Sequence, residues 1–282
     1  MSQTEEYTAE KLNTLVAEEV ERINKLDIAS LPPVHKAPES ALDSSFGELI
    51  DHTILAASAT WDQVKKVLDE ALLYQFGAVC INPVWVDKAR EYFEEIDNPP
   101  SATPKICTVL SFPLGQTPTS SKTTEGITAL LEGATELDIV ATHSYLLQSP
   151  PDYLSYYRDL ASVRQAVREA NPFAIMKVIM ETSLLNKEQI IAASLLGRLA
   201  GMEYVKTSTG FVGGGAKKED VRVMWEVVGH RGGKVKASGG VRTFEAVKEM
   251  VEAGAQRIGT SGMSGVVKAA KEGKKLEGGA GY

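Results

Sequence analysis

Residues 186–208 read NKEQIIAASLLGRLAGMEYVKTS, and the fold follows from the unit that they contain. Apolar residues recur at helical spacing over 186–200, and Gly201 follows at a point where a helix commonly stops. The next segment, 202–208, is a short apolar run that ends in polar residues. The stretch therefore predicts a helix, a tight turn and a buried strand, in that order.

The same unit repeats along most of the chain. From about Gly47, short apolar segments alternate with amphipathic ones, and we expect strands at 49–54, 78–82, 105–112, 136–141, 174–180, 202–208, 234–239 and 256–261. Strict alternation predicts a parallel sheet, and eight such units are typical of a (β/α)8 barrel. A doubly wound sheet would usually place a glycine-rich turn after its first strand, whereas LAASATW (55–61) contains no glycine. We therefore predict a (β/α)8 TIM barrel with an added N-terminal helix.

The first 45 residues differ from the repeating part. Apolar residues recur at helical spacing from Leu12 to Leu26, behind the suitable N-cap Thr8. We expect 1–45 to be a helical extension and linker, 46–272 the catalytic barrel, and 273–282 a flexible tail. The extension carries no chemical motif. It would pack on the barrel or on a partner subunit, which leaves a homodimer as an open alternative.

Composition and charge exclude several classes of protein. Of the 282 residues 43% are hydrophobic and 24% charged, as in ordinary globular proteins. The net charge of -7 argues against a nucleic-acid-binding surface, which is usually basic. The sequence contains no apolar stretch of membrane-spanning length, and MSQTEEYTAE lacks the order of a signal peptide. We expect a cytoplasmic protein without nucleic-acid or membrane partners, in which Cys80 and Cys107 are buried free thiols.

Three lysines occupy consecutive expected strands. Lys177, Lys206 and Lys236 are separated by nearly one strand–helix unit each time, so they are expected at one relative position and would point into the same barrel mouth. Glu136 and Asp138, two residues apart, would face them from the preceding strand. A single strand lysine usually reaches solvent. Crowded ammonium groups in a buried site instead favour each other's neutral form, and a neutral lysine attacks carbonyl carbon to form a Schiff base.

Two turns predict an anion site. Gly239-Gly240 follows the seventh expected strand, and Gly259-Thr260-Ser261-Gly262 lies at the end of the eighth. Barrels commonly bind phosphate at the loops after these two strands. GFVGGGAKK (210–218) is not a P-loop, because the Gly-Lys-Ser/Thr ending is missing. The sequence also lacks HExxH and paired CxxC motifs, so a metal enzyme is not expected.

Eight segments, one at each expected strand, carry a recognisable pattern: IDHT (50–53), VCINP (79–83), SFPLG (111–115), ELDIV (136–140), MKVIMET (176–182), VKTSTGF (205–211), VKASGGVRT (235–243) and RIGTSG (257–262). In this order they resemble the deoxyribose-phosphate aldolase family, from about residue 47 to residue 265. The resemblance implies a class I aldolase on a (β/α)8 barrel that uses neither metal nor cofactor. Its substrates would be a phosphorylated sugar and small aldehydes, namely 2-deoxyribose 5-phosphate, glyceraldehyde 3-phosphate and acetaldehyde.

The resemblance also implies roles for individual residues. Lys206 would be the Schiff-base nucleophile, and Lys236 and Asp138 would assist it in proton transfer. Tyr282, at the end of the glycine-rich tail, would assist proton transfer at the imine carbon. The substrate would be bound by Asp51, Cys80, Lys177, Thr209, Gly210, Gly239, Gly240, Gly259 and Ser261.

One position departs from the family pattern. Members often carry two serines after the eighth strand, whereas here Ser261 is followed by Gly262, so one hydroxyl donor to phosphate is lost. Three alternatives stay open: another Schiff-base barrel such as a transaldolase or a fructose-bisphosphate aldolase, a sugar-phosphate sensor without catalysis, and a nicotinamide-dependent reductase. The combination of Asp138, Lys206 and Lys236 argues against the sensor. The reductase would need a proton-donating Tyr or His that the sequence does not place.

Overall fold

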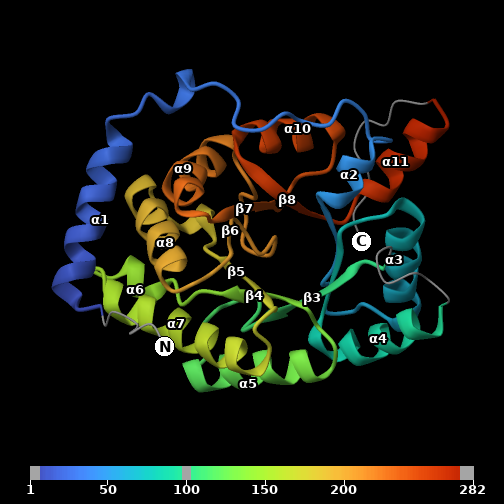
Figure 1. The fold of residues 1–282 in the computed structure, drawn as a ribbon, viewed down its shortest axis with the longest axis horizontal. Coiled ribbons are helices and arrows are strands. Elements are labelled where there is room, and N and C mark those ends of the chain that lie inside the picture. The colour runs from blue at the N-terminus through green and yellow to red at the C-terminus, as the bar shows by residue number, and fades with distance from the viewer. Residues whose placement is uncertain (1–6, 97–102, 274–282) are drawn as a thin grey trace.

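The centre of the molecule is a closed barrel of eight parallel strands surrounded by helices (Figure 1). The computed structural model describes residues 7–96 and 103–273. Each strand pairs with its neighbours in chain order, and β8 closes the barrel against β1. The predicted (β/α)8 TIM barrel is therefore confirmed. The strands are β1 (Ile50–Ile54), β2 (Ala78–Ile81), β3 (Lys105–Leu110), β4 (Glu136–Val140), β5 (Ile175–Ile179), β6 (Tyr204–Lys206), β7 (Lys234–Ser238) and β8 (Ala255–Thr260).

A helix precedes or follows each strand. The helices are α1 (Ala9–Asn24), α2 (Ser44–Glu48), α3 (Trp61–Tyr74), α4 (Val86–Glu95), α5 (Thr119–Leu131), α6 (Ser144–Leu147), α7 (Tyr153–Ala170), α8 (Lys187–Leu199), α9 (Lys218–Val228), α10 (Phe244–Ala253) and α11 (Met263–Lys271). The short helices α2 and α6 lie in connections, at the entry to β1 and after β4.

The stretch at 186–208 folds as its sequence predicts. α8 begins after Asn186, whose side chain accepts a hydrogen bond from the Gln189 backbone N–H at 2.9 Å. The Gln189 side chain accepts one from the Asn186 backbone in return, which completes a capping box. The chain then turns at Gly201, whose φ of +90° suits glycine, and β6 follows within three residues. Local capping and one glycine thus place Lys206 at the end of its strand.

Alternate strand residues separate two hydrophobic regions. Val79 and Ile81 of β2 point outward and join the large core between the strands and the helices. Ala78 and Cys80 of the same strand join a small cluster with Cys107, inside the barrel. This period-2 alternation is what a strand imposes on its side chains. The outer core therefore stabilises the barrel, and the interior is left for polar chemistry.

The N-terminal helix α1 packs on the outside of the barrel, against α7, α8 and α9 (Figure 1). Its buried side chains include Leu12, Val16 and Ile23. Glu19 on the same face is also buried and accepts hydrogen bonds from Arg22 and from Arg231, the latter at 2.8 and 3.0 Å. Burial opposes ionisation of Glu19, yet the two guanidinium groups lower its pKa below the ordinary value. The expected helical extension is thus present and docked on the barrel.

The linker from α1 to α2 runs across the top of the molecule in Figure 1, past α9 and α10. Hydrogen bonds hold the linker on these helices. The Val34 N–H donates to the Glu252 carbonyl at 2.7 Å, and Arg222 donates to the Pro32 carbonyl at 2.8 Å. The division of the chain at residues 45 and 272 stays a prediction, and all but Gly273 of the expected tail falls outside the described residues. Within the described residues, no helix combines the length and apolar character that crossing a membrane requires.

The docking of α1 can be tested with Leu12→Ala. Leu12 is fully buried, so the cavity left by its truncation is expected to lower the free energy of unfolding by about 2–5 kcal/mol. Leu131→Ala, at a side chain that is 83% exposed, is the matched control and should change it by less than about 0.5 kcal/mol. Urea unfolding measures both variants. Equal effects would mean that α1 does not dock as described.

Candidate active site

A single carboxylate, that of Asp138 on β4, joins three lysines inside the barrel. Its Oδ2 accepts hydrogen bonds from the Lys206 ammonium at 2.7 Å and from the Lys236 ammonium at 2.8 Å. Its Oδ1 accepts one from Lys177 at 2.9 Å. Asp138, Lys177 and Lys236 are fully buried, and Lys206 is 3% exposed. The structure therefore brings together the three lysines and the aspartate that the sequence singled out.

Strand register fixes the level of each lysine. Lys206 lies directly across from Lys236 on β7, so these two share one level. On the other side Lys206 lies across from Ile179, and Lys177 lies two residues deeper, across from Asp138 and Tyr204. The expectation of one relative position for all three lysines is therefore wrong for Lys177. The strands of a closed barrel are staggered, so equal spacing in sequence does not give equal height.

A second layer of charges lies beneath Asp138. Glu136 forms a salt bridge with Lys177 at 2.6 Å and accepts two hydrogen bonds from the Arg257 guanidinium at 2.7 and 2.9 Å. Arg257 also donates to Asp51, which in turn accepts from Lys236. Arg257 was not among the predicted site residues. It completes a network of four cations and three carboxylates, in which Asp51 and Lys177 support the upper layer from below.

The network sets the protonation of its members. Burial opposes the ionisation of Asp138 and Asp51, but the surrounding cations outweigh it and hold the pKa of both carboxyl groups below the ordinary value. Burial also opposes the charging of Lys177 and Lys236, yet the carboxylates raise the pKa of both ammonium groups. The expectation that crowded ammonium groups favour neutral lysines is therefore wrong for these two, because the carboxylates among them exert the stronger effect.

Lys206 has fewer carboxylate partners to compensate its charge than the other cations of the network. Among the described residues it has one carboxylate partner, Asp138, whose Oδ2 it shares with Lys236. Lys177 contacts Glu136 as well as Asp138, and Lys236 contacts Asp51 as well as Asp138. Four cations against three carboxylates leave one positive charge in excess. Lys206 is therefore the lysine of the network with the fewest carboxylate contacts.

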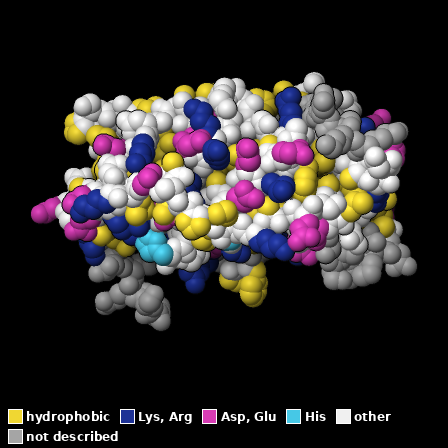
Figure 2. Space-filling view, turned by 90° about the horizontal axis from the view of Figure 1, so that it is seen from above, with side chains coloured by type: hydrophobic (Ala, Val, Ile, Leu, Met, Phe, Trp, Pro, Cys, Tyr) yellow, Lys and Arg dark blue, Asp and Glu magenta, His cyan; other side chains and the backbone are white. Residues whose placement is uncertain are grey.

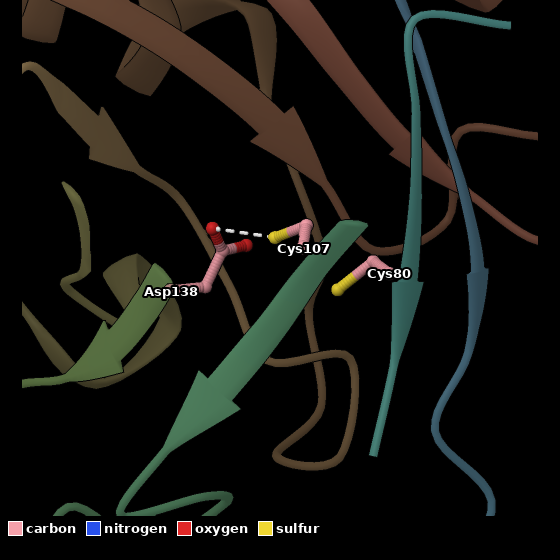
Figure 3. A group of neighbouring side chains, drawn as sticks. All are labelled: Cys80, Cys107 and Asp138. Atoms are coloured by element: carbon pink, nitrogen blue, oxygen red, sulfur yellow. Dashed lines mark hydrogen bonds between the residues drawn. The ribbon is translucent and has the colours of Figure 1, made fainter. Parts of the chain in front are cut away.

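Two thiols border the carboxylate, as Figure 3 shows for Cys80, Cys107 and Asp138. Cys107 donates to Asp138 Oδ1 at 3.3 Å and lies 3.4 Å from the Lys177 ammonium. A hydrogen bond from Cys107 lowers the pKa of the Cys80 thiol, and burial raises that of Cys107. Both are buried free thiols, as predicted. Cys80 was expected to contact substrate, but it lies beneath the open pocket and is not part of its lining.

These thiols and carboxylates also form two groups with metal-ligand atoms within 4.8 Å of one another: Cys80, Cys107 and Asp138, and Asp51, Cys107 and Glu136. Every carboxylate in them already accepts hydrogen bonds from lysine or arginine. Those cations supply the positive charge that a metal ion would bring, and a metal would have to displace them. The donor set is therefore arranged for ammonium and guanidinium groups.

Above the network lies a cavity of about 410 Å³ at the carboxyl ends of the strands. Lys206 reaches it from below, whereas Asp138 does not line it. Gly239 and Gly240, which have φ values of +87° and +77°, line this cavity in a backbone conformation that favours glycine. The predicted substrate-binding residues that gather on this cavity are Thr209, Gly210, Gly239, Gly240, Gly259 and Ser261.

Two further residues of this region have roles that the sequence analysis did not assign. Glu181 is fully buried just after β5, and one of its oxygens accepts hydrogen bonds from both the backbone N–H and the hydroxyl of Thr209. It thereby holds the loop after β6 beside the cavity. Gly259 leaves space for the side chains of Lys236 and Ser238. A Cβ at this position would lie 3.1 Å from Cε of Lys236 and 2.9 Å from Cβ of Ser238. A closed parallel barrel with a pocket at the carboxyl ends of its strands, above a buried lysine–carboxylate network, is the arrangement typical of a barrel enzyme.

Comparison with known proteins narrows this class. Residues 48–268 match the DeoC/LacD family aldolase. A deoxyribose-phosphate aldolase of Caldanaerobacter subterraneus subsp. tengcongensis is 43% identical over 80% of this chain and 93% of its own, and one of Thermococcus gammatolerans is 46% identical over 79% and 95%. The chain therefore belongs to the DeoC/LacD aldolase family, and it is an enzyme.

Solved structures agree with this assignment and cover the extension too. The crystal structure of a putative deoxyribose-phosphate aldolase from Coccidioides immitis is 36% identical, with a TM-score of 0.83 over 96% of this chain and 100% of that one. The tetrameric deoxyribose phosphate aldolase from Aeropyrum pernix is 29% identical, with a TM-score of 0.72 over 94% and 99%. The fold that surrounds the lysine network is thus shared with aldolases of known structure.

The second layer of the network can be tested with Arg257→Gln. The substitution removes the cation shared by Asp51 and Glu136, so each of these buried carboxylates loses one of its cationic partners, and the free energy of unfolding should fall by about 3–5 kcal/mol at neutral pH. The depressed pKa of Asp51 contributes stability that is lost as the pH falls through the folded-state value. Removing Arg257 raises the folded-state pKa of Asp51. The difference in the free energy of unfolding between the variant and the wild type should therefore become smaller in acid.

Urea unfolding between pH 7 and pH 3 measures this difference. Arg90→Gln on α4, a partly exposed arginine with its own carboxylate partners, is the control and should show a small, nearly constant change. A constant large deficit for Arg257→Gln at every pH would contradict the electrostatic explanation and favour a loss of packing.

Proposed function

We propose that the protein reversibly cleaves 2-deoxy-D-ribose 5-phosphate into D-glyceraldehyde 3-phosphate and acetaldehyde through a Schiff base on Lys206. The substrate is suggested by relatives above 40% identity that are named for it. The observation that carries the mechanism is the position of Lys206, which combines the least compensated charge of the network with access to the pocket. The same names favour this reaction over the transaldolase and fructose-bisphosphate aldolase alternatives.

The first steps use Lys206 as a nucleophile. Its neutral amine attacks C1 of the open-chain aldehyde, and the resulting carbinolamine loses water to give an iminium ion. The iminium withdraws electrons from the C2–C3 bond. That bond breaks as the C3 hydroxyl loses its proton, which releases glyceraldehyde 3-phosphate and leaves an enamine. Protonation of the enamine at C2 and addition of water then release acetaldehyde and restore the amine.

Lys236 and Asp138 would move the protons. The raised pKa of Lys236 keeps it an ammonium ion, so it supplies the positive neighbour that favours a neutral Lys206. The resting Asp138 carboxylate is a weak base because three ammonium groups hold its pKa low. When the Lys206 nitrogen is neutral, Asp138 loses one cationic partner and becomes more basic. Its basicity thus rises while that nitrogen is neutral, in the free amine, the carbinolamine and the enamine, and falls again in the iminium ion.

The phosphate group would lie over the glycine turns after β7 and β8. Backbone N–H groups at Gly239 and Gly240 and the nearby Arg242 supply donors and positive charge on the wall of the cavity. Gly262, which replaces a serine common in the family, has its N–H directed to the Thr260 hydroxyl at 3.3 Å. Ser261 is then the hydroxyl donor available on that turn. The proposed role of Tyr282 concerns a residue outside the described part of the chain.

Lys206→Arg tests the nucleophile. Arginine keeps a positive charge near Asp138 but cannot form the imine, so turnover should fall below detection while the far-ultraviolet circular dichroism stays that of the wild type. Borohydride reduction with acetaldehyde should add one ethyl group to the wild-type peptide that contains Lys206, and mass mapping should find none in the variant. Labelling at Lys177 or Lys236 in the wild type would reject Lys206 as the nucleophile.

Glu181→Gln tests the positioning of the loop that carries Thr209. The amide cannot accept both Thr209 bonds as strongly as the carboxylate, so KM for deoxyribose 5-phosphate should rise about 10-fold or more. Turnover of unphosphorylated deoxyribose should change less than about twofold, because its chemistry at Lys206 is untouched. Glu188→Gln, an exposed residue in the first turn of α8, is the control. Equal losses on both substrates would refute a role in phosphate binding.

A further inference from the structure

A second cavity lies at the other end of the barrel. Its volume is about 910 Å³, and it is bordered by α7, by the end of α8 and by the connections into β5 and β6, where Pro172 and Gly201 lie. Connections that lead into strands lie at the amino end of the barrel, opposite the pocket that Lys206 reaches. This cavity, called the arginine cleft below, is therefore separate from the candidate active site.

The charge of the arginine cleft is opposite to that of the whole protein. Four arginines and one carboxylate line it: Arg158, Arg164, Arg168, Arg198 and Glu203. The chain as a whole carries a net charge of -7. On the face seen in Figure 2, basic and acidic side chains are interspersed, without a large field of either sign. A local excess of guanidinium groups is self-repelling and attracts anions.

The inner arginine has unused hydrogen-bonding capacity. Arg164 is only 9% exposed, and it donates from Nε to the Gly201 carbonyl at 3.1 Å and from Nη2 to Glu203 at 2.6 Å. Its buried Nη1 has no hydrogen-bond partner within the described chain. Both carboxylate oxygens of Glu203 already accept hydrogen bonds, since the second oxygen accepts one from the Met176 N–H. A buried guanidinium nitrogen without an acceptor is costly, so the charge of Arg164 is incompletely compensated where this residue lines the cleft.

Helix dipoles explain part of this arrangement, but not all of it. Arg168 and Arg198 lie in the last turns of α7 and α8, where cations compensate helix carboxyl ends. Arg198 in addition donates to the Arg231 carbonyl at 3.0 Å, a bond that holds its guanidinium in place. Arg158 lies in the first half of α7, so the dipole gives no reason for its charge there. Arg158 and the free nitrogen of Arg164 therefore need another explanation.

The N-terminal extension supplies one wall of the cleft. Tyr7, just before α1, packs edge-on against Tyr157 of α7 with the ring centroids 5.1 Å apart, and both line the cavity. The DeoC/LacD match begins at residue 48, so this wall lies outside the shared catalytic part. Tyrosine rings and hydroxyls next to arginines suit an organic ligand with strong anionic groups.

We propose that the arginine cleft is a binding site for a small metabolite that bears two or more phosphate groups. Guanidinium groups bind phosphate oxygens in a bidentate manner, and the three positive charges in excess call for a ligand with more than one negative charge. The volume is within the range of cavities that bind small molecules. The site needs no part of the aldolase chemistry.

The probe for the experiment is inorganic pyrophosphate, titrated by isothermal calorimetry into the full-length protein. Arg158→Gln/Arg168→Gln removes two exposed arginines of the cleft and should weaken a pyrophosphate-binding step at least tenfold. Lys88→Gln/Arg90→Gln on α4 makes the same change in net charge elsewhere and should bind within twofold of the wild type. Aldolase activity without pyrophosphate should be equal in all three proteins, since none of these residues lies in the Lys206 pocket.

Four results would overturn the proposal. Unchanged pyrophosphate binding in the cleft variant would place the anion elsewhere, and equal weakening in both variants would reduce it to a general charge effect. Binding of citrate with loss in the cleft variant, without binding of pyrophosphate, would replace phosphate by carboxylate as the ligand class. A change of mass for the cleft variant in sedimentation equilibrium would identify the cleft as a contact between copies of the chain.

Discussion

The carboxylate of Asp138 is the contact on which the rest of the site depends. Three ammonium groups share its two oxygens in a space closed to water, and each would be costly to bury alone. Asp51, Glu136 and Arg257 extend this charge compensation. The charged interior is therefore stable only when all of its members are present. A barrel makes such a set possible, because its strands end in a ring and aim their alternate side chains at one axis. The hydrophobic core outside the strands supplies the stability that the charged interior does not.

The same arrangement supports the proposal that one of the three lysines is the nucleophile. The pKa values of Lys177 and Lys236 are raised, which suits these residues to the proposed role of fixed positive charges. Lys206 shares its only described carboxylate partner and lies where the pocket begins. In the proposed mechanism, the choice of Lys206 as the nucleophile rests on this unequal compensation around one carboxylate and on its access to the pocket.

Much of the fold could be predicted because its determinants are local. Single segments of the sequence contain the strand and helix periods, the glycines at which helices stop and the capping residues of α8. Lysine recurs after one strand–helix unit, and this recurrence brings Lys206 and Lys236 to one level. The rest depends on distant contacts. Arg257 lies 121 positions from Glu136 and 206 from Asp51, and nothing near it in sequence indicates a buried partner. From sequence alone, Glu181 would be taken for a solvent-exposed loop residue, because only the folded barrel brings Thr209 beside it. The depth of Lys177 depends on barrel stagger, which no single segment encodes.

The N-terminal extension gains a structural meaning from where it packs. α1 contacts α7 and α8, the helices on either side of β5 in the chain, and β5 and β6 carry Lys177 and Lys206. Its buried apolar face packs on these helices from outside, and Glu19 joins α1 to Arg231, which follows α9. Interiors are close-packed, so a shift of α7 or α8 would be transmitted to the strands that they cover. Hydrogen bonds of 2.7–2.9 Å to one carboxylate tolerate little displacement, so we expect the geometry of the Asp138 network to depend partly on the packing of α1, a helix that precedes the residues matched by the family.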